Sequence, residues 1–228
     1  NQGDNISLTA IANQSSDMKL FLNGTQIQAA TGVTTISANP LLTTSGNQTI
    51  RVDATVGATT KSESFQFYVA PAVNIAALPA GVRDGINYET GNTSAVLVLY
   101  APGKNRVSVI GEFPGSNWSE QTAYQMNKTP DGNYWWLRIT GLTAGQEYAF
   151  QYLVDGTIKV GDPYAEKILD PNNDSFITPA TYPNLKAYPA GQSGIVSVLQ
   201  TNSPGYTWNV NNFQRPDKRN LVIYELLL

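Results

Sequence analysis

The side chains that most often carry nucleophilic and acid–base catalysis are missing from this sequence, because its 228 residues include no Cys and no His. This excludes disulfide scaffolds, zinc sites built from thiolate or imidazole, and catalytic arrangements that pair Ser or Cys with His. Only carboxylates, Lys or Tyr remain for acid–base chemistry. An oxygen-only calcium site would need spaced Asp and Asn ligands, and no loop of the EF-hand type is present. We therefore expect no metal and no cofactor.

Aromatic residues, whose ring faces can bind flat ligands, are concentrated in the second part of the chain. The first 70 residues contain no Trp and only Tyr68, whereas all four Trp and eleven of the twelve Tyr follow. An aromatic platform for a ligand is therefore expected after residue 70.

The composition is that of a polar protein with few charges. Charged residues make up 14% of the chain and the net charge is −3, while Thr, Asn, Gln, Ser and Gly are plentiful. This amino-acid composition favours an all-β protein and an extracytoplasmic location (secreted, periplasmic or on the surface of a bacterium). Lys and Arg are scattered singly, which argues against a nucleic-acid partner. No apolar run reaches the length of a membrane span, and no signal peptide is present.

Residues 1–70 contain short alternating segments that predict half-buried strands. The dipeptide Asn23-Gly24 supplies the two positive φ angles of a type I′ hairpin turn. Strands at this spacing without a helical period predict a small immunoglobulin-like sandwich, followed by a linker at Ala70–Ala72. The alternating apolar positions are Ile6, Leu8, Ala10; Met18, Leu20, Leu22; Ile50, Val52, Ala54; and Phe65, Phe67, Val69.

Residues 73–200 show a second series of strand signals separated by turn dipeptides, which predicts a second β-sandwich. The clearest hairpin signal is Asp155-Gly156, which directly follows an aromatic strand. The predicted strands are Ala95–Tyr100, Val107–Phe113, Tyr134–Thr140 and Tyr148–Val154.

The last part of the chain changes from polar to apolar. Residues 201–219 are irregular and suit a connector, whereas residues 220–228 form an apolar run that predicts a strand buried in a parallel sheet. Because domain ends are usually solvated, such an ending leads us to expect a further domain that is missing here.

Several segments of the second part resemble carbohydrate-binding module family 48. Modules of this family typically precede the catalytic barrel of glycoside hydrolase family 13, the α-amylase family. The ending Leu221–Glu225 resembles the first strand of that barrel. The layout is similar to secreted α-amylase-type enzymes of Bacteroidetes, and the resemblance covers roughly residues 78–228. The segments that carry it are Val107–Phe113 with its Gly-x-Phe ending, Asn117-Trp118, Met126–Gly132, Tyr134–Leu137, Tyr148–Gly156 and Asp162–Tyr164.

The resemblance implies a set of candidate carbohydrate-binding residues: Trp118, Gln151, Asn117, Trp136 and Lys159. Trp118 could stack on a sugar ring, and the alternative is that it only pins its loop to the sheet. Gln151 falls where glycogen-binding members have Lys. The second stacking Trp of such members is replaced by the segment Thr157–Lys159. Trp135 is expected in the core and Trp136, on the opposite face, partly exposed against a neighbouring domain or a sugar.

The acidic residues do not indicate a catalytic pair. A glycosidase needs two carboxyl groups about 5 to 10 Å apart. In the family, the densest acidic cluster lies in a loop that approaches the barrel, and the catalytic carboxylates lie on later barrel strands. We expect a solvated or interface loop and no catalytic residue in this chain. The cluster consists of Asp162, Glu166, Asp170 and Asp174.

The sequence thus predicts an all-β chain of two immunoglobulin-like β-sandwich domains in tandem, over 1–70 and 73–200. A connector over 201–219 and a short stump of a missing (β/α)8 barrel over 220–228 would follow. The predicted function is that of non-catalytic N-terminal accessory domains of an α-amylase-type glycoside hydrolase acting on starch, glycogen or maltodextrin. They would support or orient the barrel, their partner within the same protein, and could bind α-glucan. Two alternatives stay open: an autonomous starch- or glycogen-binding module, and an adhesion-type immunoglobulin-like surface protein.

Overall fold

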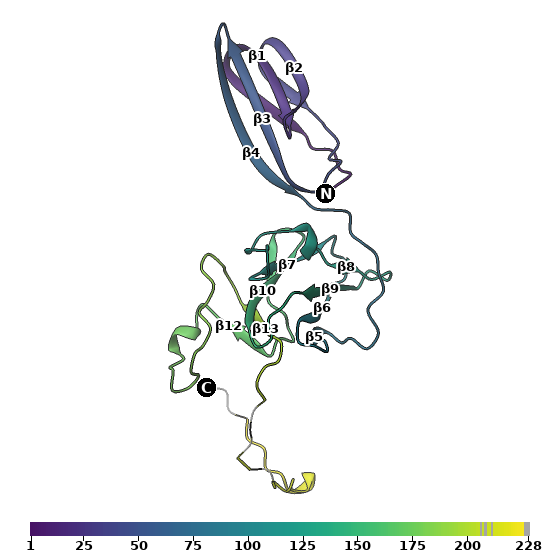
Figure 1. Cartoon of the computed structure of the whole chain (residues 1–228), viewed down its shortest axis with the longest axis vertical. Coiled ribbons are helices and arrows are strands. Elements are labelled where there is room, and N and C mark those ends of the chain that lie inside the picture. The colour runs from purple at the N-terminus through teal and green to yellow at the C-terminus, as the bar shows by residue number, and fades with distance from the viewer. Residues whose placement is uncertain (206, 208, 211, 226–228) are drawn as a thin grey trace.

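The computed structural model describes residues 1–205, 207, 209–210 and 212–225. This part of the chain is all-β, with thirteen strands in three antiparallel sheets and three short 3-10 helices (Figure 1). None of its helices is long and apolar enough to cross a membrane. The strands are β1 (Leu8–Leu22), β2 (Thr25–Ala38), β3 (Gly46–Val56), β4 (Thr59–Val69), β5 (Gly85–Tyr88), β6 (Ser94–Tyr100), β7 (Val107–Gly111), β8 (Asn127–Lys128), β9 (Tyr134–Thr140), β10 (Glu147–Val154), β11 (Ile158–Val160), β12 (Lys167–Leu169) and β13 (Val196–Gln200).

The N-terminal part is a single four-stranded sheet in the order β2-β1-β3-β4. Asn23 and Gly24 have φ angles of 51° and 81°, which confirms the predicted hairpin turn between β1 and β2. The two sheets of the predicted sandwich are not formed. Instead, the register of β1 against β2 shifts between Ile11 and Ser16, and the long hairpin folds back so that Ile36 packs with Met18 and Leu20. The alternation of apolar and polar residues indicates which face of a strand is apolar, but it does not determine how many sheets the strands form.

The second part is a sandwich of two sheets, as the sequence predicts. One sheet has the order β5-β6-β9-β8; the other has the order β11-β10-β13-β12, with β7 also paired to β10. The four predicted strands match β6, β7, β9 and β10 within two residues at each end. The core between the sheets is strongly aromatic and includes Trp135, Tyr152, Phe113 and Phe150. In the hairpin after β10, Asp155 and Gly156 have φ angles of 51° and 75°, which confirms that turn.

Consecutive tryptophans on β9 point to opposite faces of the sheet, as predicted. Trp135 is 0% exposed and its indole N–H donates to the Ala101 carbonyl at 3.0 Å. Trp136 is half-buried, and its indole N–H donates to the Ala76 carbonyl at 3.1 Å. Ala76 belongs to the segment that joins β4 to β5, so Trp136 packs against the chain's own linker.

Gly111 at the end of β7 allows an unusually close approach of two strands. It lies opposite Phe150 on β10, and a Cβ added to it would come within 2.4 Å of the Ala149 carbonyl oxygen and 2.9 Å of the Phe150 Cα. Phe113, two residues later, enters the core and lies between Tyr148 and Tyr124, with ring centroids 5.8 Å apart in each case. The Gly-x-Phe ending therefore combines close strand contact with an aromatic anchor.

A buried polar link ties β10 to the segment after β11. The Tyr152 hydroxyl donates to Asp162 Oδ2 at 2.7 Å, and the Tyr164 N–H donates to Asp162 Oδ1 at 2.8 Å. Burial raises the pKa of Asp162 above its ordinary value, against the opposing effect of these two hydrogen bonds. Burial also raises the pKa of Tyr152 well above 10.0.

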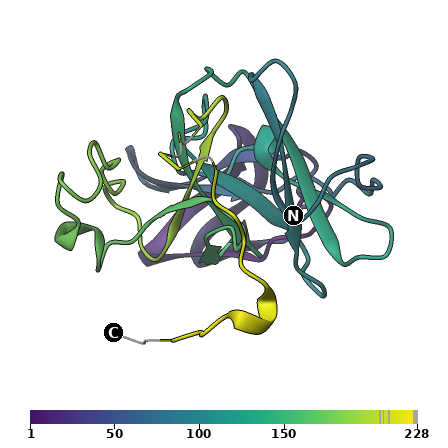
Figure 2. The same ribbon diagram turned by 90° about the horizontal axis from the view of Figure 1, so that it is seen from below.

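The C-terminal part leaves the sandwich as irregular chain, yellow in Figure 2, with one 3-10 turn at Lys218–Asn220. Leu221 to Tyr224 are 50% to 85% exposed and do not form a strand. Residues 220–225 thus form no strand within this chain, residues 226–228 lie outside the described residues, and the barrel strand expected over 220–228 stays a prediction. An apolar run forms a strand only where a sheet edge is available to pair with it.

We expect Gly111→Ala to destabilise the sandwich by about 3 kcal/mol, because the new methyl group meets backbone atoms that cannot yield. Urea unfolding followed by tryptophan fluorescence measures this, since all four Trp follow residue 70. Gly205→Ala is the matched control, because a Cβ at Gly205 meets nothing within 4 Å. Equal stability losses in the two variants would contradict the packing argument.

We expect Asp162 to make folding stability depend on pH in the opposite sense to an ion-paired carboxylate. Its raised pKa means that the protonated form favours the folded state, so this contribution is complete below the ordinary value of 3.8 and is lost as the pH rises through the folded pKa. The free energy of unfolding of the unaltered chain minus that of Asp162→Asn should therefore fall as the pH rises from below 3.8. Urea unfolding at a series of pH values tests this, and a constant or rising difference would contradict it.

Candidate functional site

The outer face of the β10–β13 sheet carries Trp118, the main candidate for stacking on a sugar ring. Its floor consists of Ala149, Leu169, Val196 and Val198, all buried. Three partly buried side chains pack on this floor: Trp118, Leu185 and Tyr188. Two of them come from the segment between β12 and β13, which projects to one side of the sandwich (Figure 2).

Trp118 is held in a constrained turn. Asn117 and Trp118 have φ angles of 44° and 60°, in the left-handed region that bulky residues rarely adopt. The turn is fixed at Gly111, whose carbonyl accepts the Trp118 N–H at 3.2 Å and whose N–H donates to the Ser116 hydroxyl at 3.2 Å. Trp118 therefore packs onto the sheet, as the loop-pinning alternative predicts, and leaves part of its ring at the surface, whereas Asn117 is exposed.

Gln151 does not reach the surface. It is 0% exposed, and its side-chain amide donates to the carbonyls of Ser193 and Ile195 at 2.8 and 2.9 Å. Both N–H groups of this amide are thereby used to hold the segment before β13. The prediction of a sugar contact at Gln151 fails in this conformation, because a later segment of the chain covers it.

The remaining candidates lie apart from this surface or at its rim. Lys159 on β11 is exposed, and its ammonium donates to Gln192 Oε1 at 2.9 Å. Ile158, in the segment that replaces the second stacking Trp, is 49% exposed. Trp136 lies on the other sheet and contacts the linker, so it is not brought together with Trp118.

Sequence reasoning missed the polar and aromatic groups that the β12–β13 segment contributes. The Tyr188 hydroxyl donates to the Gly194 carbonyl at 2.8 Å, and burial raises the pKa of Tyr188. Lys186 forms a salt bridge of 2.9 Å with Glu112. No motif could have identified Lys186 and Tyr188, because they lie about 70 residues after Trp118 in an irregular segment.

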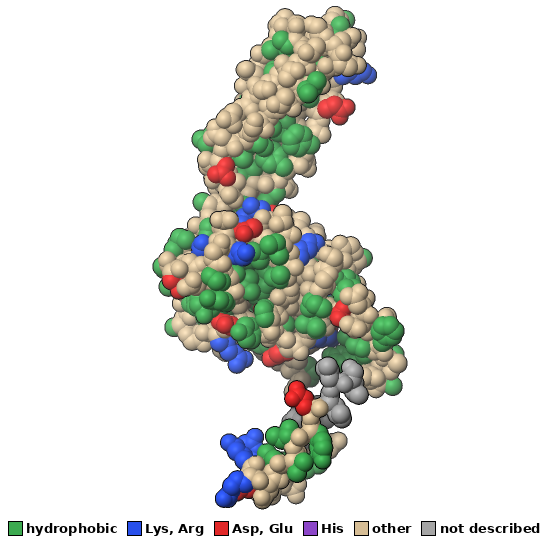
Figure 3. All heavy atoms as spheres, turned by 180° about the vertical axis from the view of Figure 1, so that it is seen from behind, with side chains coloured by type: hydrophobic (Ala, Val, Ile, Leu, Met, Phe, Trp, Pro, Cys, Tyr) green, Lys and Arg blue, Asp and Glu red, His purple; other side chains and the backbone are tan. Residues whose placement is uncertain are grey.

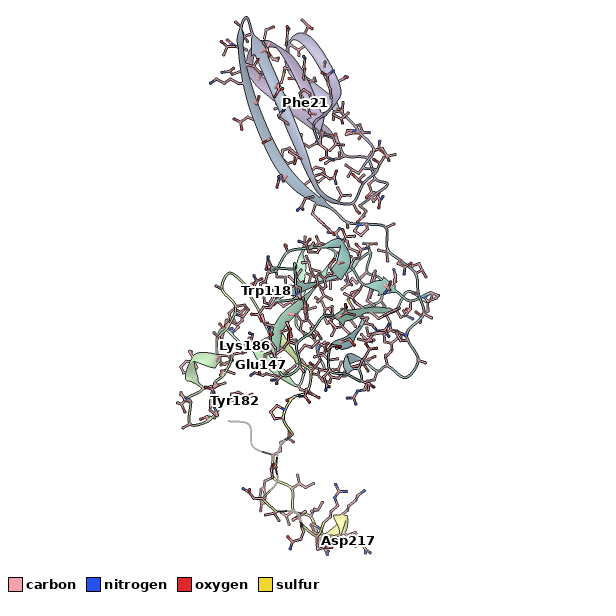
Figure 4. The ribbon with its side chains drawn as sticks, in the orientation of Figure 1. Phe21, Trp118, Glu147, Tyr182, Lys186 and Asp217 are labelled. Carbon is pink, nitrogen blue, oxygen red and sulfur yellow. The ribbon has the colours of Figure 1, made fainter. Side chains whose placement is uncertain are left out.

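A second group of side chains continues the same face (Figure 4). Lys167 forms a salt bridge of 2.7 Å with Glu147 and lies 4.7 Å from the centre of the Tyr182 ring. Burial lowers the pKa of Lys167, but the combined effect of Glu147 and Tyr182 outweighs burial, so the net shift of the pKa is upward. A hollow of about 640 Å³ is lined by the β12–β13 segment, including Tyr182, Tyr188 and Asp174. Aromatic faces next to Lys, Asp and Asn groups are the chemistry that suits a sugar ring and its hydroxyls.

The acidic cluster divides among structural roles. Asp162 is held by the Tyr152 hydroxyl, and Asp174 accepts the Asp170 N–H at 3.0 Å. Asp170 accepts the Asn172 N–H at 2.9 Å, and hydrogen bonds to this N–H and to Asn173 lower the pKa of Asp170. Glu166 lines a separate hollow with Arg83. Within the described residues, no three acidic side chains gather as a metal site, and charged side chains are scattered over the face seen in Figure 3.

Comparison with known proteins identifies one family and two related enzymes. Residues 85–171 match the family described as carbohydrate-binding module 48 (isoamylase N-terminal domain). A 1,4-α-glucan branching enzyme of Butyrivibrio fibrisolvens is 36% identical over 93 residues, which are 40% of this chain and 14% of that enzyme. The branching enzyme of Hydrogenovibrio crunogenus is 31% identical over 99 residues, 41% of this chain and 13% of the enzyme.

Among solved structures, the catalytic module of the pneumococcal glycogen-degrading virulence factor SpuA aligns with 58% of this chain and 19% of its own length. The identity is 19% and the TM-score 0.35. The chain matches only about 14% of the length of the first branching enzyme. Residues 85–171, which lie in the two-sheet sandwich described above, thus match the carbohydrate-binding module 48 family, and about 40% of the chain is similar to part of two α-glucan branching enzymes.

Proposed function

We propose that this chain is a non-catalytic accessory region of an α-glucan-active enzyme of glycoside hydrolase family 13, and that its main role is to support or orient a catalytic domain. The observation that carries this proposal is the covered outer face of the β10–β13 sheet. Gln151 is buried there and bonded to the chain's own carbonyls. Trp118 uses much of its ring to pack on the sheet. These contacts of Gln151 and Trp118 within the chain favour a role in stabilising the module over a role in binding a ligand.

The finer features of this proposal come from the sequence. The resemblance of Leu221–Glu225 to a first barrel strand supports a (β/α)8 catalytic barrel as the partner within the same protein. The same resemblance supports an α-amylase-type enzyme of the Bacteroidetes, with starch, glycogen or maltodextrin as substrates. The polar composition with few charges supports an extracytoplasmic location. The family match over 85–171 favours this reading over an adhesion-type protein.

A second candidate function, α-glucan binding by the module itself, is favoured by one observation. Trp118 and Tyr188 lie on the same apolar floor and keep part of their rings exposed, and the ion pair of Lys186 with Glu112 supplies polar groups from the same segment and turn. Such a face could hold a short stretch of glucan even though Gln151 is covered.

The accessory role predicts that the 228-residue chain has no turnover on α-glucans. Incubation with maltooligosaccharides, followed by chromatographic analysis of chain lengths, should show no hydrolysis and no transfer, because Asp162, Asp170 and Asp174 of the acidic cluster are held in hydrogen bonds within the chain. A family 13 amylase under the same conditions is the positive control. New product lengths that depend on this chain would contradict the proposal.

Affinity electrophoresis in amylopectin gels separates the two candidate functions. The accessory role predicts that the unaltered chain and Trp118→Ala migrate alike. The binding candidate predicts that the unaltered chain is retarded, and that Trp118→Ala weakens binding about tenfold, since an aromatic contact contributes up to about 1.5 kcal/mol. Trp136→Ala is the matched control, because Trp136 lies on the other sheet. Retardation lost equally in both variants would contradict a site at Trp118.

A further inference from the structure

The fourth strand of the N-terminal sheet has a long free edge. Among the described residues, β4 pairs with β3 alone, and the order β2-β1-β3-β4 leaves its other side open (Figure 1). Its register against β3 runs unbroken from Gly46 opposite Val69 to Val56 opposite Thr59, so no bulge interrupts the strand. Residues 59–66 are all exposed.

Natural sheets usually protect such an edge with a bulge, a proline or a short strand, because its unpaired N–H and C=O groups can pair with another strand. The sequence of β4 contains no proline, and β4 has eleven residues. Its free edge is therefore suited to pairing with a second strand.

The charges on β4 are complementary to those of an identical strand. Lys61 and Glu63 are two residues apart, so they share one face of the sheet. Their neighbours on β3 are Ala54 and Val52, which leave both charges without an opposite charge across the strand pair. Within the described part of the chain, neither residue takes part in a salt bridge.

We propose that β4 pairs antiparallel with β4 of a second copy of this chain, about a twofold axis at Ser62. In this register Lys61 of each copy lies opposite Glu63 of the other, which gives two cross-strand ion pairs. Shifting the register by one pair in either direction places Lys61 opposite Lys61, or Glu63 opposite Glu63. Because like charges directly opposite are unfavourable and opposite charges favourable, the charges select the register centred on Ser62.

The packing beside β4 supports the same interface. An apolar hollow of about 210 Å³ reaches the edge of β4 at Glu63, Ser64 and Phe65, and Leu8 and Ile50 also line it. Phe65 is 52% exposed. In the proposed register Phe65 lies opposite Thr59 of the second copy, so the added strand covers part of this apolar edge. The result is a continuous eight-stranded sheet made from two four-stranded sheets.

Charge-swap variants test the proposal. Sedimentation equilibrium of the unaltered chain should show a monomer–dimer equilibrium that weakens as salt is added. Lys61→Glu and Glu63→Lys each place like charges at both contacts, and should each weaken dimerisation about tenfold or more. An equimolar mixture of these two variants restores opposite charges in the mixed pair and should associate as the unaltered chain does. The double variant Lys61→Glu/Glu63→Lys should also dimerise.

Lys19→Glu is the matched control, because it changes the net charge equally at an exposed position on the central strand β1. It should leave dimerisation unchanged. Circular dichroism should show that every variant keeps its fold, since the exchanged side chains are exposed. Three outcomes would each overturn the proposal. The chain could stay monomeric at all concentrations, the single charge swaps could leave dimerisation unchanged, or the mixture of the two variants could fail to restore association. Glucan binding by the same variants tests residues 85–171 separately from dimerisation through β4.

Discussion

The close contact of β7 with β10 at Gly111 is the constraint on which the second domain depends. No side chain larger than hydrogen fits against the Ala149 carbonyl at this position. The contact sets the spacing that lets Phe113 enter the aromatic core, and the backbone groups of Gly111 also fix the turn that carries Trp118. The close contact at Gly111 therefore positions both Phe113 in the core and the turn that carries Trp118.

Buried polar side chains in and near the candidate site form hydrogen bonds within the protein and are not free to bind a ligand. An amide or carboxylate that is removed from water must be bonded inside the protein. The side-chain N–H groups of Gln151 meet this demand with the carbonyls of Ser193 and Ile195, whereas Gln151 Oε1 is buried without a partner among the described residues; Asp162 meets it with the Tyr152 hydroxyl. Residues 85–171 match the carbohydrate-binding module 48 family, and Leu185 and Tyr188 of the β12–β13 segment pack on the outer face of the β10–β13 sheet.

The elements of the fold were largely predictable because they depend on local patterns. Strand patterns located β6, β7, β9 and β10 of the second part, and the left-handed residues Asn23-Gly24 and Asp155-Gly156 marked two hairpins. The partition of residues 1–70 into sheets was not predictable, since it depends on register shifts in β1. The barrel strand expected over 220–228 stays a prediction: residues 220–225 are not in a strand here, because an apolar pattern does not supply the neighbouring strand with which it must pair.

The sequence by itself determined which chemistry the chain lacks, where its strands and turns lie, and that residues near Trp118 resemble a carbohydrate-binding module. Only the tertiary structure decided which of these side chains remain free. Gln151 was covered by residues more than 40 positions later, and Tyr188 joined Trp118 from a segment without any motif. The tendency of a segment to form a strand depends on its own residues, whereas strand pairing and burial depend on contacts between distant segments, which no local pattern specifies.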